Sequence, residues 1–152
     1  MGAKNIFLID DGSSLEDIRD IGIGVNIIEA DIGLPEKLPE GIILFHFKKN
    51  LGRSKVGVFP GWWRSFTFSS KIAKKYNFDK IIMCESDAYI MRKRLFVYIK
   101  SLKTGWTALW CPRCCFPETA LQIICEDSIE KLENLYIAGE VLWKSNVFAE
   151  QI

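Results

Sequence analysis

This sequence is poor in histidine, has almost no net charge and contains no long apolar run. His46 is the single histidine, so a Ser-His-Asp or Cys-His catalytic site would have to use it, and no nucleophile elbow is present. Lys and Arg total 20 while Asp and Glu total 19, which leaves a net charge of +1. Because such a chain has no long-range field to attract a polyanion, we expect no sequence-independent binding of nucleic acid. His46 alternates with Phe45 and Phe47, and we expect it to have a structural role.

Segments that would direct the chain into a membrane are also missing. The first apolar run, residues 6–9, ends at two aspartates and is too short for the core of a signal peptide. No run approaches the roughly 18 apolar residues of a membrane-spanning helix. Ile6 stands where N-myristoylation needs Ser or Thr. We therefore expect a cytoplasmic protein, with peripheral contact to a membrane surface left open.

Cysteine is present but in an odd number, which does not suggest a disulfide framework. The spacing of Cys111 and Cys114 can hold zinc, although the second pair of a full zinc motif is absent. A small zinc-stabilised interaction protein is therefore one alternative. Cys84, Cys111 and Cys125 each end an apolar run, so we expect these three thiols to lie in or beside the core.

Composition indicates a globular protein, because 49% of the residues are hydrophobic and 26% are charged. A chain of 152 residues has the size of one domain, and we assign residues 1–152 to a single domain. Short apolar or β-branched runs predict strands at residues 5–9, 25–30, 41–47, 79–84, 106–111 and 120–125, the last possibly antiparallel. Helical spacing or capping signals predict helices at residues 13–22, 60–76 and 91–103 and in the tail from residue 128.

This alternation of strands and helices predicts an α/β fold, with a mostly parallel sheet covered by helices on both faces. Within the third predicted helix, Met91, Leu95, Ile99 and Leu102 share one face, which we expect to pack against the sheet.

Acidic residues follow two of the predicted strands directly. Asp10 and Asp11 come after the first strand, and Glu85 and Asp87 flank Ser86 after the fourth. Ligands of open parallel sheets bind beyond the carboxyl ends of the strands. Carboxylates there can accept hydrogen bonds from a ribose or a base, and a pair two residues apart can hold a divalent cation. The alternative is that these acids only mark solvated strand ends.

These segments resemble the nucleotide-sugar glycosyltransferases of the GT-A fold, especially their large inverting family. The resemblance is carried by FLIDDGSS at residues 7–14 and by FDKIIMCESDAYIMRKRLFVYIKSL at residues 78–102. NLGRSKVGVFPGWWRSF lies between them, and the similar region spans roughly residues 5–110. Three features depart from the family pattern. Glu85 replaces the usual Asp, the family's first strand with its "PxYN" loop is missing, and the acceptor-side segment after the acidic motif is short.

The resemblance implies a Rossmann-like GT-A architecture and a glycosyltransferase that uses a UDP-sugar donor with Mn²⁺ or Mg²⁺. Asp10 and Asp11 would contact the uracil and the ribose, and Arg53 or Arg64 would approach the diphosphate. Asp87 would ligate the metal, with Glu85 in the family's first acidic position and Ser86 beside the nucleotide-sugar.

Candidates for the catalytic base follow the acidic motif along the chain. They are Glu118, Glu126 and Asp127, each of which could instead be an ordinary surface acid. The acceptor, whether glycan, lipid or protein, is left open, as is a non-catalytic nucleotide-binding module. The basic run at residues 92–94 could face phosphates or an anionic membrane surface.

Overall fold

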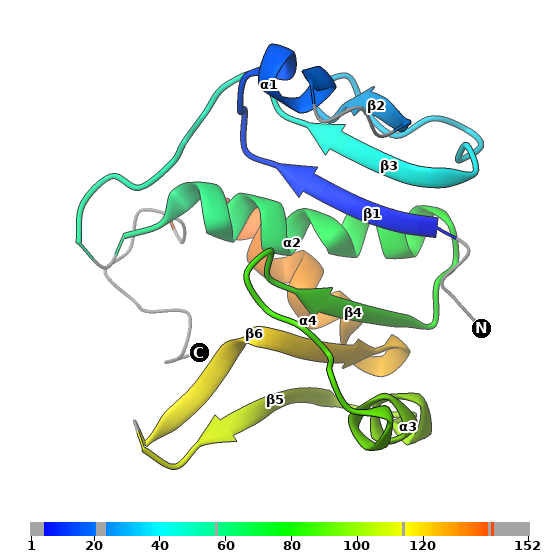
Figure 1. Ribbon diagram of the computed structural model, residues 1–152, viewed down its shortest axis with the longest axis vertical. Helices are drawn as coiled ribbons and strands as arrows, with labels where there is room; N and C mark the ends of the chain where they lie inside the picture. Colours follow the sequence, from blue (N-terminus) through cyan, green and yellow to red (C-terminus); the bar gives the residue numbers. More distant parts are fainter. Residues whose placement is uncertain (1–4, 21–23, 57, 114, 140, 142–152) are drawn as a thin grey trace.

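The computed structural model describes residues 5–20, 24–56, 58–113, 115–139 and 141, which form a mixed α/β fold with two three-stranded sheets (Figure 1). The elements follow one another as β1 (Asn5–Asp10), α1 (Leu15–Asp20), β2 (Val25–Glu29), β3 (Gly41–His46), α2 (Pro60–Lys75), β4 (Lys80–Cys84), α3 (Lys93–Ser101), β5 (Trp106–Cys111), β6 (Phe116–Cys125) and α4 (Glu126–Ala138).

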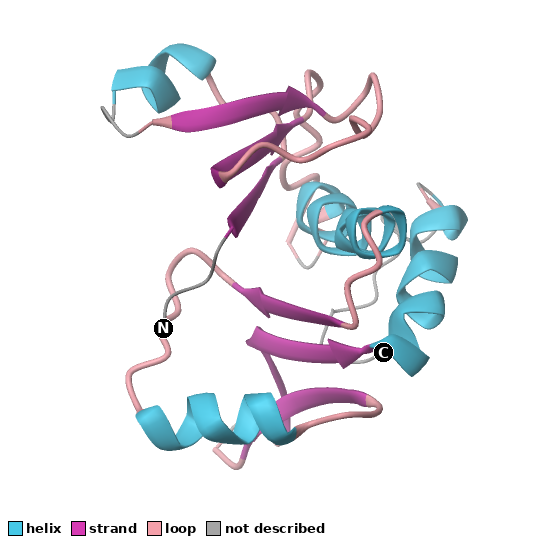
Figure 2. Ribbon diagram, turned by 90° about the vertical axis from the view of Figure 1, so that its right-hand side faces the viewer, coloured by secondary structure: helices cyan, strands magenta, loops and turns pink. Residues whose placement is uncertain are grey.

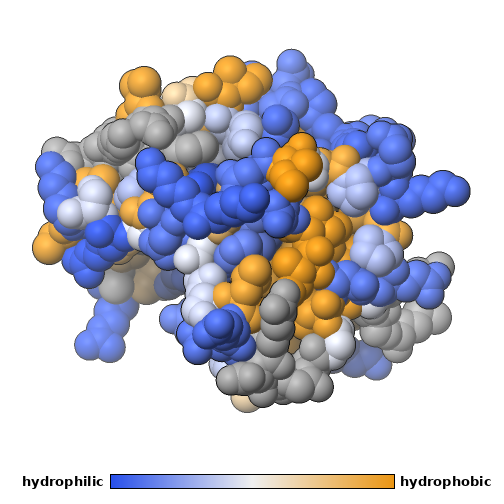
Figure 3. Space-filling view, turned by 90° about the horizontal axis from the view of Figure 1, so that it is seen from above, coloured by the Kyte–Doolittle hydropathy of each residue, from blue (hydrophilic) through white to orange (hydrophobic). Residues whose placement is uncertain are grey.

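The first sheet is parallel and has the order β1-β3-β2, as its short apolar runs predict. Side chains alternate along the central strand, so Ile43 and Phe45 point to one face and pack against Phe68 and Ile72 of α2. The other face is less covered, since Ile6 and Leu8 of β1 are 50% and 45% exposed. Seen from above in Figure 3, hydrophobic residues reach the surface between hydrophilic ones.

The second sheet is antiparallel and has the order β4-β6-β5, so the prediction of a mostly parallel sheet is wrong for this half of the fold. Residues 112–115 alone separate β5 from β6. A parallel pair needs a crossover of a dozen or more residues, and so short a connection can join only antiparallel neighbours. The antiparallel orientation considered for residues 120–125 is therefore confirmed, and the fold class is α/β in the broader sense of a mixed α/β protein.

Helices cover both faces of this second sheet. Leu121 and Ile123 of β6 face α3 through Ile99, whereas Ile124, on the opposite face, packs with Trp63 of α2 and with α4. Figure 2 shows α3 lying apart from α2 and α4. Because α2 also packs on the first sheet, it joins the two cores.

The helical face predicted for residues 91–103 is correct in three of its four members. Leu95, Ile99 and Leu102 pack against the second sheet, but Met91 is 89% exposed because α3 begins only at Lys93. None of the helices in the described part of the chain has both the length and the apolar composition required to cross a bilayer.

The direction of the strands places two loops at the same end of the molecule. The arrows of β1 and β4 point the same way in Figure 1, toward the end at which α2 begins. The residues that follow β1 and those that follow β4 therefore lie at one edge. By contrast, Cys125 pairs with Lys80 at the start of β4, so β6 ends at the opposite edge.

Candidate functional site

Asp10 is held at the end of β1 by four hydrogen bonds. Its Oδ2 accepts from the amides of Gly12 and Ser13 at 3.0 and 2.9 Å, and from Nδ1 of His46 at 2.8 Å. Its Oδ1 accepts from Ser13 Oγ at 2.5 Å. Burial raises the pKa of Asp10, but the bonds from Ser13, His46 and Gly12 outweigh it and hold the pKa below its ordinary value.

His46 meets Asp10 because the two residues are register partners in the parallel pair of β1 and β3. The imidazole is only 6% exposed, and its bond to Asp10 satisfies a ring nitrogen that burial removes from water. His46 therefore helps to hold Asp10 at the end of the parallel sheet.

Asp11 points into the loop that precedes α2. Its Oδ2 accepts from the amides of Leu51 and Gly52 at 3.0 and 2.7 Å, and its Oδ1 accepts from Nη2 of Arg64. Arg64 is 7% exposed and also donates to the carbonyl of Lys49 at 2.6 Å. Its guanidinium lies 4.0 Å from the ring centroid of Phe47, a cation–π distance. Asp11 and Arg64 therefore form a charge-assisted pair whose guanidinium is buried and whose carboxylate is partly buried.

The first turn of α2 connects the two acidic strand ends. A Cβ at Gly61 would lie 2.1 Å from Oδ2 of Asp11, so only glycine permits this approach. The next residue, Trp62, donates from Nε1 to Oε1 of Glu85 at 2.8 Å. Together, Asp10, Asp11, Arg64, Trp62 and Glu85 form what we call the strand-end cluster.

Ser86 and Asp87 lie on the turn that follows β4 and are exposed. This turn is fixed by the bond from the Ala88 amide to the carbonyl of Glu85 at 3.0 Å and by the Glu85 amide, which donates to Ala120 at 2.9 Å. Within the described residues, Asp87 has no hydrogen bond or ion pair. Its carboxylate is therefore open to a ligand.

Arg53 is separated from Arg64. It is exposed, donates to the carbonyl of Lys55 at 3.3 Å and lies over the ring of Phe59. The structure thus buries Arg64, one of the two predicted diphosphate ligands, in an ion pair with Asp11, and leaves Arg53 on the surface of the loop before α2.

No group of three or more metal-binding side chains gathers anywhere in the described part of the chain. Mg²⁺ sites in phosphate-handling enzymes do not need such a cage, because one or two carboxylates and the phosphates of the substrate complete the coordination. The exposed Asp87, and Glu85 two residues before it, offer the carboxylates that a site of that kind needs. Their oxygen chemistry suits a hard cation.

The three candidate bases are divided between the two edges. Glu126 and Asp127 begin α4 at the edge opposite Glu85, and Asp127 caps the amide of Gly105 at 2.8 Å. The prediction did not account for the direction of β6, which carries these two acids away from the strand-end cluster. Glu118 lies two residues before Ala120, the partner of the Glu85 amide, and is therefore near the cluster's edge.

Glu118 also borders an aromatic groove of about 540 Å³ between the second sheet and helices α2 and α4. Glu118 pairs with Leu109 at the point where the β5–β6 register shifts, and such bulges often re-aim side chains beside active sites. The groove is lined by Trp63, Phe66, Trp106, Ala108, Trp110, Pro117, Glu118, Thr119, Gln122, Lys131 and Leu135.

The cysteines do not converge in the described residues. Cys125 is buried, Cys111 is partly buried and Cys84 is exposed, so the expectation that Cys84 lies in or beside the core is wrong. Cys84 ends β4 and its side chain turns toward the carbonyl of Ala88. Cys114, the second member of the predicted zinc spacing, lies outside the described residues.

Comparison with protein-family models, with curated proteins and with solved structures finds no match to this chain.

Sequence reasoning missed three contacts of the strand-end cluster: His46 with Asp10, Arg64 with Asp11, and Trp62 with Glu85. The first depends on the pairing of β1 with β3, which the sequence analysis did not predict. The other two join residues 53 and 23 positions apart and depend on where α2 docks.

Proposed function

We propose that this chain is a glycosyltransferase domain that binds a UDP-sugar and a divalent cation at the edge where β1 and β4 end. One observation carries the proposal: Trp62 and Arg64, in the first two turns of α2, contact the two acidic strand ends, while the turn at Ser86 and Asp87 stays open. Ligands of open parallel sheets bind beyond the carboxyl ends of the strands, which applies to β1. β4 belongs to the antiparallel sheet, and the contact of Trp62 with Glu85 brings its end to the same helix.

The hydrogen bonds assign different roles to the two aspartates. A carboxylate offers about four acceptor positions, and Asp10 uses four within the chain. Asp10 is therefore a positioning residue. Asp11 accepts three bonds and retains the capacity for one more, so we assign to it the predicted contact with uracil or ribose.

Asp87 and Glu85 would hold the cation, and Arg53 in the loop before α2 would face the diphosphate. A bound Mn²⁺ or Mg²⁺ supplies positive charge that stabilises the departing diphosphate. Arg53 adds fixed charge at the same place, and Ser86 offers a hydroxyl to the phosphate oxygens.

Glu118 is the candidate base that remains near this edge. Its carboxylate borders the aromatic groove, which is within the size range of small-molecule sites. An acceptor hydroxyl bound in this groove could lose its proton to Glu118 as it attacks the anomeric carbon. Aromatic rings beside a few polar groups fit an acceptor with both apolar and hydroxyl-bearing faces.

A non-catalytic nucleotide-binding module is the second candidate. It is favoured by the position of Glu126 and Asp127 at the opposite edge, which leaves Glu118 as the single remaining base among the three predicted.

Calorimetric titration with UDP tests donor binding. We expect binding in Mn²⁺ that is lost in EDTA and lost in Asp87→Asn. Asp79→Asn is the matched control, because Asp79 is exposed just before the start of the same strand. Equal affinity of both variants and the parent, with or without metal, would reject the proposal.

Release of UDP from a UDP-sugar separates the enzyme from the module. Turnover that disappears in Glu118→Gln while UDP affinity stays unchanged supports the transferase. UDP binding without turnover across a panel of donors and acceptors favours the module.

A further inference from the structure

The surface of α3 and the segment before it combine positive charge with exposed apolar side chains. From residue 88 to residue 117 the sequence contains six basic residues and no acidic one, although the whole chain is nearly neutral. We name as the α3 patch the six residues Tyr89, Met91, Arg92, Lys93, Arg94 and Val97.

The apolar members of the α3 patch are unusually exposed. Met91 is 89% exposed, Tyr89 80% and Val97 56%. α3 packs inward through Leu95 and Ile99, and at 100° per residue Lys93 and Val97 lie on the opposite side of the helix. The outer side of α3 therefore presents a central valine beside basic residues, and Lys100 lies over the ring of Phe96 on the same helix.

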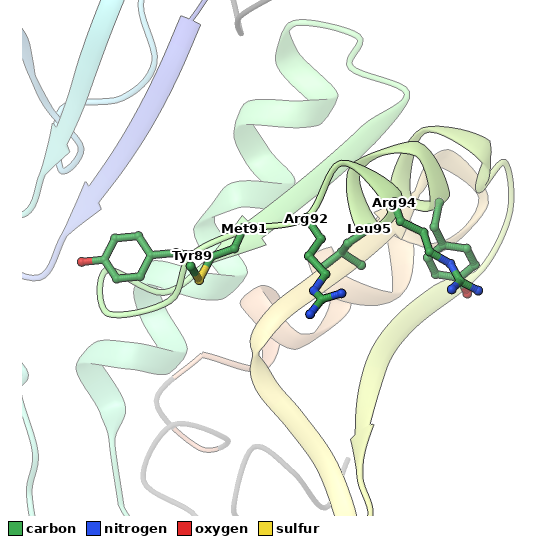
Figure 4. Close-up of a pocket in the computed structure, with 6 residues that line it drawn as sticks. Tyr89, Met91, Arg92, Arg94 and Leu95 are labelled. Atoms are coloured by element: carbon green, nitrogen blue, oxygen red, sulfur yellow. The ribbon is translucent and has the colours of Figure 1, made fainter.

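A shallow pocket of about 530 Å³ lies at the start of α3 within this patch. Figure 4 shows the side chains of Arg92 and Arg94 on either side of Leu95, while Tyr89 extends away from them. The pocket thus pairs an apolar floor with two guanidinium groups, which bind phosphate well.

We propose that the α3 patch docks on the surface of a membrane that contains anionic lipids. Basic side chains near such a surface gain attraction from lipid phosphates and carboxylates, while aromatic and aliphatic side chains enter the headgroup boundary. The aliphatic side chains of Met91 and Val97 favour lipid over nucleic acid, because single-stranded nucleic acid binds by stacking on aromatic rings.

Sedimentation with vesicles tests the proposal. The intact protein should bind vesicles of phosphatidylserine and phosphatidylcholine, bind phosphatidylcholine alone far more weakly, and release at high salt. The triple variant R92Q/K93Q/R94Q should lose about 100-fold in affinity, at roughly fivefold per basic residue. The charge-matched control K37Q/K71Q/K75Q, outside the α3 patch, should lose much less.

A second variant tests the apolar component without removing charge. Met91→Ser with Val97→Ser should weaken vesicle binding about tenfold, and unchanged circular dichroism would show that these exposed positions leave the fold intact. Binding of the parent to neutral and anionic vesicles alike, or equal binding by R92Q/K93Q/R94Q, would overturn the proposal. So would binding of the parent to a single-stranded oligonucleotide but not to anionic vesicles.

Discussion

Removal of the Asp11 carboxylate should destabilise the protein far more than removal of an ordinary surface acid. Asp11→Ala leaves the amides of Leu51 and Gly52 without their acceptor and leaves Arg64, 7% exposed, without its anion. Breaking a buried ion pair from one side costs about 3–5 kcal/mol. A domain of this size has a free energy of unfolding of about 5–15 kcal/mol. The variant should therefore still fold, but with a much smaller free energy of unfolding.

Urea denaturation at neutral pH measures this loss directly. Asp17→Ala, which removes an exposed acid on α1, should change the free energy of unfolding by less than about 0.5 kcal/mol. The double variant Asp11→Ala/Arg64→Met removes both charges and should recover part of the loss, because no unpaired guanidinium stays buried. A loss below about 1 kcal/mol in Asp11→Ala, or a double variant less stable than the single, would refute the reasoning.

The remaining predictions concern a glycine, an acid and the thiols. Gly61→Ala should lower the thermal midpoint by about 5 °C or more, because its Cβ would displace Asp11; an unchanged midpoint would show that the contact is loose. The difference in unfolding free energy between the parent and Asp10→Asn should be full at pH 6 and shrink as the pH falls below the ordinary value of 3.8, because the folded state holds the pKa of Asp10 down; a constant difference would contradict the assignment. Cys125→Ala should cost about 1–2 kcal/mol and Cys84→Ala almost nothing, since one thiol is buried and the other exposed. Stoichiometric zinc, with loss of circular dichroism in EDTA, would overturn the structural reading of the thiols.

Local structure was largely predictable from local signals. In the described part of the chain, apolar runs located the six strands, and helical spacing or capping signals located the four helices, with the start of β6 as the main error. That strand begins at Phe116, four residues before the predicted start. The prediction began too late because Pro117 and Glu118 resemble a loop in sequence. Pro is tolerated there because, among the described residues, β4 pairs with β6 only from residue 121 to residue 125, so the start of β6 has a strand partner on one side alone.

The orientation of the second sheet was harder to predict than its strands. The predicted alternation of strands and helices favoured parallel neighbours, but the short connection between β5 and β6 requires an antiparallel pair. The predicted connection, residues 112–119, is also shorter than the dozen or more residues of a parallel crossover. The length of this connection therefore already favoured the antiparallel orientation considered for residues 120–125, and the rule from strand–helix alternation was applied too widely.

The candidate site was predictable only as two separate acidic strand ends. That these ends share an edge follows from strand direction, but the contacts joining them depend on the docking of α2. No local pattern indicates that Arg64 reaches Asp11 or that Trp62 reaches Glu85. Glu126 and Asp127 were chosen by their order along the chain, which does not determine the edge at which they lie.

The thermal midpoint in the presence of UDP and Mn²⁺ is the sharpest test of metal-dependent UDP binding at the edge where β1 and β4 end. At a ligand concentration about 100 times the dissociation constant, binding adds about 2.7 kcal/mol of stability. For a chain of this length, that corresponds to a rise of about 5–10 °C. We predict this rise for the parent and for Asp79→Asn, and no rise in EDTA or in Asp87→Asn. An unchanged midpoint of the parent at saturating UDP and Mn²⁺, or an equal rise in Asp87→Asn, would contradict the account.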